Sequence, residues 1–252
     1  MSAARGTALV TGAARRIGRA LALAVAEAGF DVAIHHLQSH EDAESLAGEI
    51  AALGRRPHVL TADLSQEAET RALVGQAARA LGPVTLLINN ASVFEDDRIE
   101  TFDAEGWRSH MEVNLHAPLM LAQTFAAALP QDRRGLIINL LDQRVWNPNP
   151  QFFTYSLSKA ALWTATRTLA QALAPRIRVN GIGPGPTLPS VHQSAEMFQA
   201  EAANVLLERR AEPADIVAAA LYLIDAGSVT GQMIAVDGGQ HLSWRTPDIV
   251  HP

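Results

Sequence analysis

The N-terminal part of the chain has the pattern of a strand, a glycine turn and a helix. Residues 7–11 form a short apolar run that ends at Gly12, and an Ala/Leu-rich segment with helical periodicity follows from Arg16 to Gly29. Gly12 permits a tight turn, and Gly18 lets the helix lie close to the strand. Free backbone amides at the start of such a helix face an anion. The pattern is therefore typical of the first unit of a nucleotide-binding fold, although a glycine turn alone also serves as structural punctuation.

The same alternation of strands and helices continues through most of the chain. Apolar runs of strand length lie at residues 31–35, 58–61, 85–88, 135–141, 177–182 and 232–236. Helical segments lie at 41–53, 65–81, 104–129, 152–173 and 213–226. A length of 252 residues suits one α/β domain, and no internal repeat or linker interrupts the alternation. We therefore expect one domain over residues 1–252, with a doubly wound parallel sheet of about seven strands and helices on both faces.

Two segments depart from this alternation. Residues 183–187 have the sequence Gly-Pro-Gly-Pro-Thr, which forces an irregular loop. We expect a substrate loop over about 186–210, with a short mobile helix near 195–207. Residues from about 240 to 252 are expected to form a C-terminal surface arm.

Composition argues against several classes of function. The chain has no cysteine and its nine histidines form no ligand-spaced cluster, so no metal site is expected. The formal net charge of −6 gives no general attraction to nucleic acid or to an anionic membrane. No apolar run reaches the ~18–20 residues that cross a bilayer, and the N-terminus lacks a signal-peptide core. These features predict a cytoplasmic protein.

The end of the second expected strand decides which dinucleotide such a fold binds. An acidic residue there would hold the ribose 2′-hydroxyl of NAD and repel the 2′-phosphate of NADP, and none is present. His36 and Ser39 lie there instead. Arg15 and Arg16 lie on the neighbouring turn, so the local charge favours NADP. The alternative is that both arginines are solvated surface charges.

Tyr155 and Lys159 lie four residues apart in an expected helix, so their side chains project from the same face. A phenol titrates near pH ~10 and an ammonium near ~10.4, so neither is reactive alone at neutral pH. The Lys159 cation would favour the phenolate and lower the pKa of Tyr155, giving a group able to pass a proton to a substrate. The spacing is common by chance, so its meaning depends on the rest of the chain.

Polar residues follow several expected strands, at the edge where open α/β sheets bind ligands. Asn90-Ala91-Ser92 follows the fourth strand and Asp142 the fifth. Asp63 follows the third, where it either accepts from an adenine amino group or caps the next helix. Asn114 lies inside an expected helix, where it either satisfies a neighbouring carbonyl or breaks the helix ladder and holds a water.

These motifs together resemble the short-chain dehydrogenase/reductase family. The matching features are TGxxxxxG after the first strand, NNA after the fourth, YxxxK thirteen residues past a polar residue that ends the fifth, and PG after the sixth. The resemblance covers nearly the whole chain and implies a Rossmann-type domain, a nicotinamide cofactor, and Tyr155, Lys159 and Asn114 in the catalytic set. The implied cofactor-binding positions are Gly12, Arg15, Arg16, Ile17, His36, Ser39, Asp63, Leu64, Asn90, Ala91, Ser92, Tyr155, Lys159, Pro184, Gly185 and Thr187.

Two departures from the family pattern narrow the resemblance. The family usually has Ser in place of Asp142 and Gly in place of Arg16. Together with Phe94, these residues look like the pteridine reductase branch, which includes bacterial dihydromonapterin reductases. That likeness implies substrate-binding roles for Arg16, Phe94 and Asp142, with Asp142 beside Tyr155. Gln38 departs from the Arg or Asn found in that branch near the 2′-phosphate.

The residue at position 142 also bears on the substrate. A carboxylate would repel the alkoxide that forms when a ketone is reduced. A dihydropterin fits better, because its C=N nitrogen needs a proton and its ring edge presents N–H donors. We expect an NADPH-dependent enzyme that reduces this bond, with Tyr155 as proton donor, Phe94 stacked on the ring, and Asn114 with Lys159 relaying a proton from water.

Alternatives remain at each level. Phe94 also fits a core aromatic, Asp142 fits a turn cap or a partner of Arg144, and Arg16 fits a contact to phosphate alone. Another carbonyl substrate, such as a 3-oxoacyl thioester or a sugar, is a second function, and an NADPH-binding sensor without turnover is a third. The Ala-rich helices at 104–129 and 152–173 carry much apolar surface and, with the resemblance, suggest a homotetramer.

Overall fold

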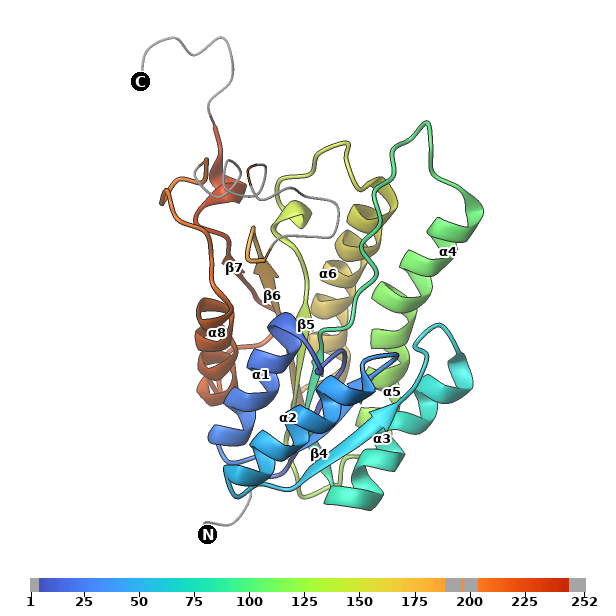
Figure 1. Ribbon diagram of the computed structural model, residues 1–252, viewed down its shortest axis with the longest axis vertical. Coiled ribbons are helices and arrows are strands. Elements are labelled where there is room, and N and C mark those ends of the chain that lie inside the picture. The colour runs from blue at the N-terminus through green and yellow to red at the C-terminus, as the bar shows by residue number, and fades with distance from the viewer. Residues whose placement is uncertain (1–4, 189–195, 197–203, 245–252) are drawn as a thin grey trace.

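A seven-stranded parallel sheet forms the centre of the protein, in the order β3-β2-β1-β4-β5-β6-β7. The computed structural model describes residues 5–188, 196 and 204–244 (Figure 1). The strands are β1 Thr7–Val10, β2 Asp31–His36, β3 Pro57–Thr61, β4 Val84–Asn89, β5 Gly135–Leu140, β6 Ile177–Pro184 and β7 Met233–Val236. The helices are α1 Arg16–Glu27, α2 His40–Ala52, α3 Glu67–Leu81, α4 Ala104–Met111, α5 Ala117–Ala128, α6 Phe153–Leu173 and α8 Pro213–Asp225.

Helices cover both faces of the sheet, as the nearly continuous apolar strands require. On one face α1, α2 and α8 bury Leu21, Leu46 and Ile216 against the sheet. The helices α3, α5 and α6 pack against the other face of the sheet, where Leu73 and Phe125 are fully buried. The expected doubly wound fold is therefore confirmed, and the expected strands and helices agree with the observed ones to within about two residues at most ends.

The expected helix over 104–129 is interrupted at Asn114, as one of the two alternatives for this residue predicts. A π-helical turn, Glu112–His116, separates α4 from α5 and contains the fully buried Asn114. Such turns interrupt the regular α-helical hydrogen bonds and are frequent at functional sites, so the break at Asn114 is part of the site. Most of the helix expected near 195–207 lies outside the described residues, and so does the arm beyond residue 244. The described residues 240–242 form a short 3-10 turn.

The sheet reverses its strand order between β1 and β4, which is where open α/β sheets place their ligand crevice. Thr11 joins the two strands there, because its Oγ1 accepts from the backbone N–H groups of Asn90 at 2.9 Å and Ala91 at 3.0 Å. Asp142 follows β5 directly, and Pro184 ends β6. All the polar strand ends predicted from the sequence therefore reach one edge of the sheet.

Candidate active site

Gly12 and Gly18, in the turn after β1, have no room for a side chain. Gly12 has a φ of 60°, a conformation that favours glycine, and a Cβ on it would lie 3.0 Å from Cα of Ala91. A Cβ on Gly18 would overlap the carbonyl oxygen of Gly12. The turn therefore presents bare backbone to the crevice, where a phosphate can approach the start of α1.

His35 supports this turn from beneath. Its Nδ1 accepts the Gly12 N–H at 3.1 Å, and its Nε2 lies 3.0 Å from the carbonyl oxygen of Ala62. The two contacts fix a neutral ring with the proton on Nε2. Burial lowers the pKa of His35 to about 4, against a smaller opposing effect of the Ala62 hydrogen bond. No sequence motif marks His35 as part of the site, since only the fold brings it under the turn.

Arg16 adopts a strained backbone at the position where the family usually has glycine. Its φ is 53°, and the left-handed region costs a non-glycine residue roughly 1–2 kcal/mol. Its Nη2 donates to the carbonyl oxygen of Leu188 at 3.2 Å. Arg15 forms an ion pair with Asp42 on α2. The expected two-arginine charge is thus partly neutralised, by a carboxylate too distant in sequence to be anticipated.

Two adjoining cavities occupy the crevice, of about 280 and 410 Å³, and both are lined by Arg16, Ile17, Asn90 and Ser92. The first also includes Phe94, Asp142, Gln143, Arg144, Phe152, Tyr155, Lys159, Pro184, Gly185, Thr187 and Gln240. The second also includes Gly12, Arg15, His35, Leu37, Asp63, Leu64 and Ala91. Because Arg16 borders both, it is placed to contact ligands in each.

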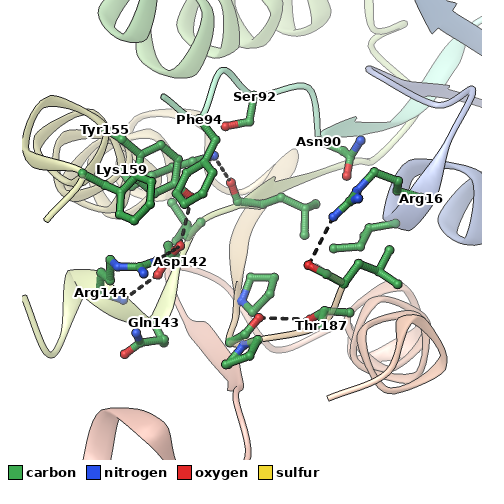
Figure 2. Close-up of a pocket in the computed structure, with 18 of the residues that line it drawn as sticks. Arg16, Asn90, Ser92, Phe94, Asp142, Gln143, Arg144, Tyr155, Lys159 and Thr187 are labelled. Carbon is green, nitrogen blue, oxygen red and sulfur yellow. Dashed lines mark hydrogen bonds and ion pairs between the residues drawn. The ribbon is translucent and has the colours of Figure 1, made fainter. Parts of the chain in front are cut away.

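Tyr155 and Asp142 meet in the first cavity (Figure 2). The Tyr155 hydroxyl donates to Oδ2 of Asp142 at 2.9 Å. Asp142 also accepts from Arg144, through the backbone N–H at 2.8 Å and through Nη1 at 3.3 Å. Asp142 therefore caps the turn, pairs with Arg144 and also accepts from the Tyr155 hydroxyl.

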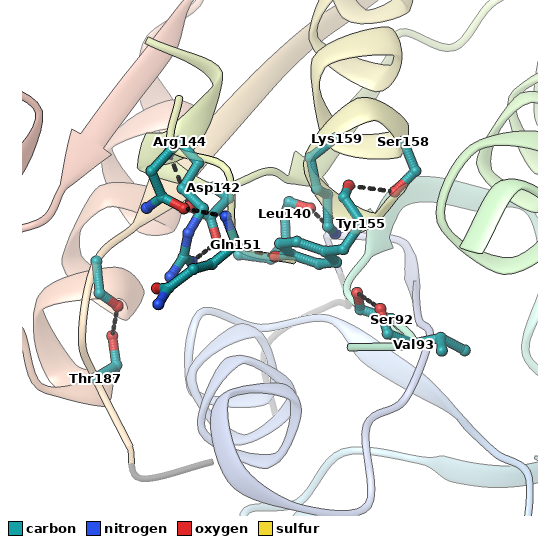
Figure 3. A network of polar contacts seen from close by, with 12 residues as sticks. Ser92, Val93, Leu140, Asp142, Arg144, Gln151, Tyr155, Ser158, Lys159 and Thr187 are labelled. Atoms are coloured by element: carbon teal, nitrogen blue, oxygen red, sulfur yellow. Dashed lines mark hydrogen bonds and ion pairs between the residues drawn. The ribbon is translucent and has the colours of Figure 1, made fainter. Parts of the chain in front are cut away.

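The expected lowering of the Tyr155 pKa is wrong for this structure. Burial, followed by the charge and the hydrogen bond of Asp142, raises the pKa of Tyr155 well above its ordinary value, and Arg144 opposes this only in part. Lys159 is not among the groups that lower this pKa, and its Nζ donates to the Leu140 carbonyl at 2.8 Å (Figure 3). Burial also lowers the pKa of Lys159 to about 8, partly opposed by Asp142. Tyr155 is therefore a protonated phenol at neutral pH.

Asn114 orders the loop after β4. Its Oδ1 accepts from Ser92 Oγ at 3.1 Å and from the Val93 N–H at 2.8 Å. Its Nδ2 donates to the Val93 carbonyl at 2.9 Å and to Ser158 Oγ at 3.1 Å. All four hydrogen-bonding positions of the amide are filled. The expected water relay through Asn114 stays a prediction that needs one of these bonds to be exchanged.

Phe94 follows that loop and belongs to an aromatic cluster. Its ring stacks on Phe152 with centroids 4.2 Å apart and planes at 14°, and it meets Tyr155 edge to face at 4.7 Å. His110 holds the next residue, because its Nε2 accepts from the Glu95 N–H at 3.2 Å. Phe152, which the sequence analysis missed, has a φ of 52° and shares the cavity wall.

Most of the predicted site residues line one of the two cavities, and three do not. Asn114 is buried behind the loop, His36 is buried with Nε2 3.0 Å from Thr61 Oγ1, and Ser39 lies at the start of α2. Asp63 lines the second cavity, where its carboxylate accepts from the Ser65 N–H at 2.9 Å. Because α3 begins only at Glu67, Asp63 shapes the preceding turn and does not cap the helix.

The parts of the chain that the structure describes contain no group of three side chains arranged to hold a metal ion. They also contain no helix of sufficient length and apolarity to cross a membrane.

The site combines a Tyr–Lys pair with a neighbouring carboxylate at the ligand edge of a parallel sheet, which is the arrangement of a nicotinamide-dependent reductase.

Comparison with known proteins identifies the family. The model described as Enoyl-(Acyl carrier protein) reductase matches residues 12–241. The 3-oxoacyl-(acyl-carrier-protein) reductase FabG of Staphylococcus epidermidis is 31% identical over 241 residues, which cover 94% of this chain and 99% of that protein. The chain therefore belongs to the short-chain dehydrogenase/reductase family of oxidoreductases.

Two solved structures with bound NADP or NADPH are similar to this chain over nearly its whole length. The structure of FolM Alternative dihydrofolate reductase 1 from Brucella canis complexed with NADP is 50% identical with a TM-score of 0.94, and the match covers 98% of each chain. A blue fluorescent protein from a metagenomic library, in complex with NADPH, is 32% identical with a TM-score of 0.86, covering 94% of this chain and 98% of that one.

Proposed function

We propose that the protein is an NADPH-dependent reductase of a dihydropterin C=N bond, with Tyr155 as the proton donor. The observation that carries the proposal is the 2.9 Å hydrogen bond from the Tyr155 hydroxyl to Asp142 inside the first cavity. A carboxylate beside the acid suits a nitrogen heterocycle with N–H donors and disfavours a developing alkoxide. The 50% identity to an alternative dihydrofolate reductase supports the same substrate class.

The residues of the second cavity fit a phosphorylated dinucleotide. Gly12 and Gly18 have no room for a Cβ, so backbone amides line the crevice where phosphates would bind. Arg16 supplies positive charge beside it, Arg15 is paired with Asp42, and no acidic residue ends β2. NADPH bound there would supply the hydride. The two NADP(H)-bound relatives support this choice of cofactor.

The protonation states also suit reduction. The raised pKa of Tyr155 keeps the phenol protonated at neutral pH, so it can deliver a proton to the ring nitrogen as hydride reaches the carbon. Asp142 accepts from the phenol and orients it, and the one lone pair left on its Oδ1 can accept from an N–H group of the substrate. We assign Lys159 to the nicotinamide ribose and, through a water, to reprotonation of Tyr155. Its buried ammonium lies on the same helix face as Tyr155, 5.7 Å from the ring centroid.

Substrate recognition would use both walls of the first cavity. Phe94 presents an aromatic surface for a flat ring, backed by its stack with Phe152. Arg16 borders both cavities and would contact the pterin carbonyl and a cofactor phosphate. We assign Asn114 a positioning role, since it fixes the loop that carries Ser92 and leads to Phe94.

An NADPH oxidation assay separates this proposal from its competitors. Dihydrobiopterin or dihydromonapterin is offered beside an acetoacetyl thioester at equal concentration. Pterin turnover supports the proposal, and thioester turnover alone assigns a 3-oxoacyl reductase, the second candidate that the 31% identity to FabG favours. NADPH binding with no turnover of either substrate assigns a binding protein.

We further propose a cytoplasmic homotetramer. The absence of cysteine suits a reducing compartment. Exposed apolar side chains on and beside the helices named in the sequence analysis, Phe102, Trp107 and Leu157, are 40–41% accessible in the single chain and would be covered by subunit contacts. Light scattering at micromolar concentration tests the assembly, and a monomer mass contradicts it.

A further inference from the structure

The short turn after Asp142 is not built for stability alone. Gln143 and Arg144 begin the 3-10 turn Gln143–Val145, and each buries a polar atom, Oε1 and Nε respectively, for which the described residues offer no hydrogen-bond partner. A buried polar atom without a partner is costly, and native proteins keep few of them. Both residues line the first cavity, so the cost points to a role toward its ligand.

Arg144 holds Asp142 from two directions. Its backbone N–H donates to Oδ1 at 2.8 Å and its Nη1 donates to Oδ2 at 3.3 Å. The side chains of the pair are only 15% and 12% exposed. Removing one partner of such a buried pair leaves the other without its hydrogen bonds, which is costly. The Oδ2 atom that Arg144 contacts also accepts from Tyr155.

The same guanidinium lies over the aromatic wall. Its Cζ is 5.3 Å from the ring centroid of Phe152 and 5.9 Å from that of Phe94, within the range of cation–π attraction. Arg144 therefore connects the carboxylate to both rings. Its backbone N–H alone would explain a turn cap, but a cap gives no reason for the guanidinium to lie between Asp142 and the ring pair.

We propose that Arg144 is a specificity-determining positioning residue, which holds the Asp142 carboxylate beside Tyr155 and fixes Phe94 and Phe152 as a wall for a flat heterocycle with N–H donors. The inference rests on the proposed function for its substrate class, a pterin. It extends that function because none of the catalytic or substrate roles inferred from the sequence is assigned to Arg144. Lysine at this position would keep the charge and lose the planar contact, whereas glutamine would lose the charge.

Binding of methotrexate, a 2,4-diaminopteridine, tests the role without requiring turnover. Titration calorimetry on the NADP-saturated protein compares the wild type with Arg144→Gln, Arg144→Lys and Arg79→Gln at one neutral pH. Arg79 is an exposed residue of α3 outside both cavities and serves as the matched control. NADP affinity is measured in parallel and is expected to be equal in all four proteins.

Arg144→Gln is expected to weaken methotrexate binding about ten- to hundredfold, the loss typical of one hydrogen bond to a charged group. Arg144→Lys, which keeps the charge, should recover part of the lost affinity. Arg144→Gln binding within twofold of wild type, or Arg144→Lys binding no better than Arg144→Gln, overturns the inference. A wild type that binds methotrexate but reduces no dihydropterin refutes the proposed reaction, and the affinities of the Arg144 variants still decide the role of Arg144.

Discussion

Acidification is expected to destabilise the protein through His35, the buried histidine beneath the glycine turn. In the folded protein the pKa of His35 is lowered to about 4 from its ordinary 6.5, chiefly by burial. The ring is 2% exposed, so solvent screens this effect little. The unfolded chain takes up a proton near pH ~6.5 while the folded chain resists it, so stability is full above that pH and falls toward pH 4.

The size of the loss follows from the two pKa values. For folded and unfolded values of about 4 and 6.5, linkage gives a loss of about 2 kcal/mol by pH 5 and about 3 kcal/mol by pH 4, relative to pH 7.5. Protonation would also place an N–H on Nδ1, which now accepts from Gly12 at 3.1 Å. The turn that presents backbone amides to the cofactor should therefore loosen together with the fold.

Urea unfolding followed by tryptophan fluorescence, at pH 7.5, 6.5, 5.5 and 5.0 and at one protein concentration, measures the effect. His35→Gln is the matched variant, because its amide can accept from Gly12 and donate to Ala62 but does not titrate. His36 and His110 also have lowered pKa values and destabilise both proteins alike. The wild type should lose about 2 kcal/mol more than the variant between pH 7.5 and 5. Equal losses in the two proteins would refute the reasoning.

Four substitutions test the rest of the site. Asp142→Ser should abolish dihydropterin reduction and spare NADPH binding, and unchanged pterin turnover would remove the argument from the carboxylate. Tyr155→Phe should lower kcat by about 10²–10⁴-fold with little change in NADPH affinity, and retained activity would reassign the acid. Gly18→Ala should weaken NADPH binding at least about tenfold by fluorescence titration, because its Cβ would overlap the Gly12 carbonyl, whereas Gly48→Ala, with open space around it, should bind normally. His110→Phe removes the hydrogen bond to the loop beside Phe94 and should raise KM for the pterin more than it lowers kcat, and a change confined to kcat would contradict that positioning role.

Much of the fold was readable from local patterns. Apolar runs of strand length alternate with helical periodicity, and strands buried on both faces leave little ambiguity about a parallel sheet. The break at Asn114 was not readable as a π turn, because an amide in a helix has no single preferred partner. It is decided by Val93 and Ser158, which are distant in sequence and reach Asn114 only in the folded chain.

The sequence by itself determined which groups are available: a phenol and an ammonium on one helix face, a carboxylate after β5, and glycines where the cofactor turn must be bare. Only the tertiary structure decided their electrostatic states. Burial and Asp142 raise the pKa of Tyr155, although Lys159 alone predicted the opposite, and His35 becomes a neutral support of the turn. The physical reason is that a pKa depends on solvent exclusion and on charges a few ångströms away, and folding sets both by bringing together residues that are distant in the chain.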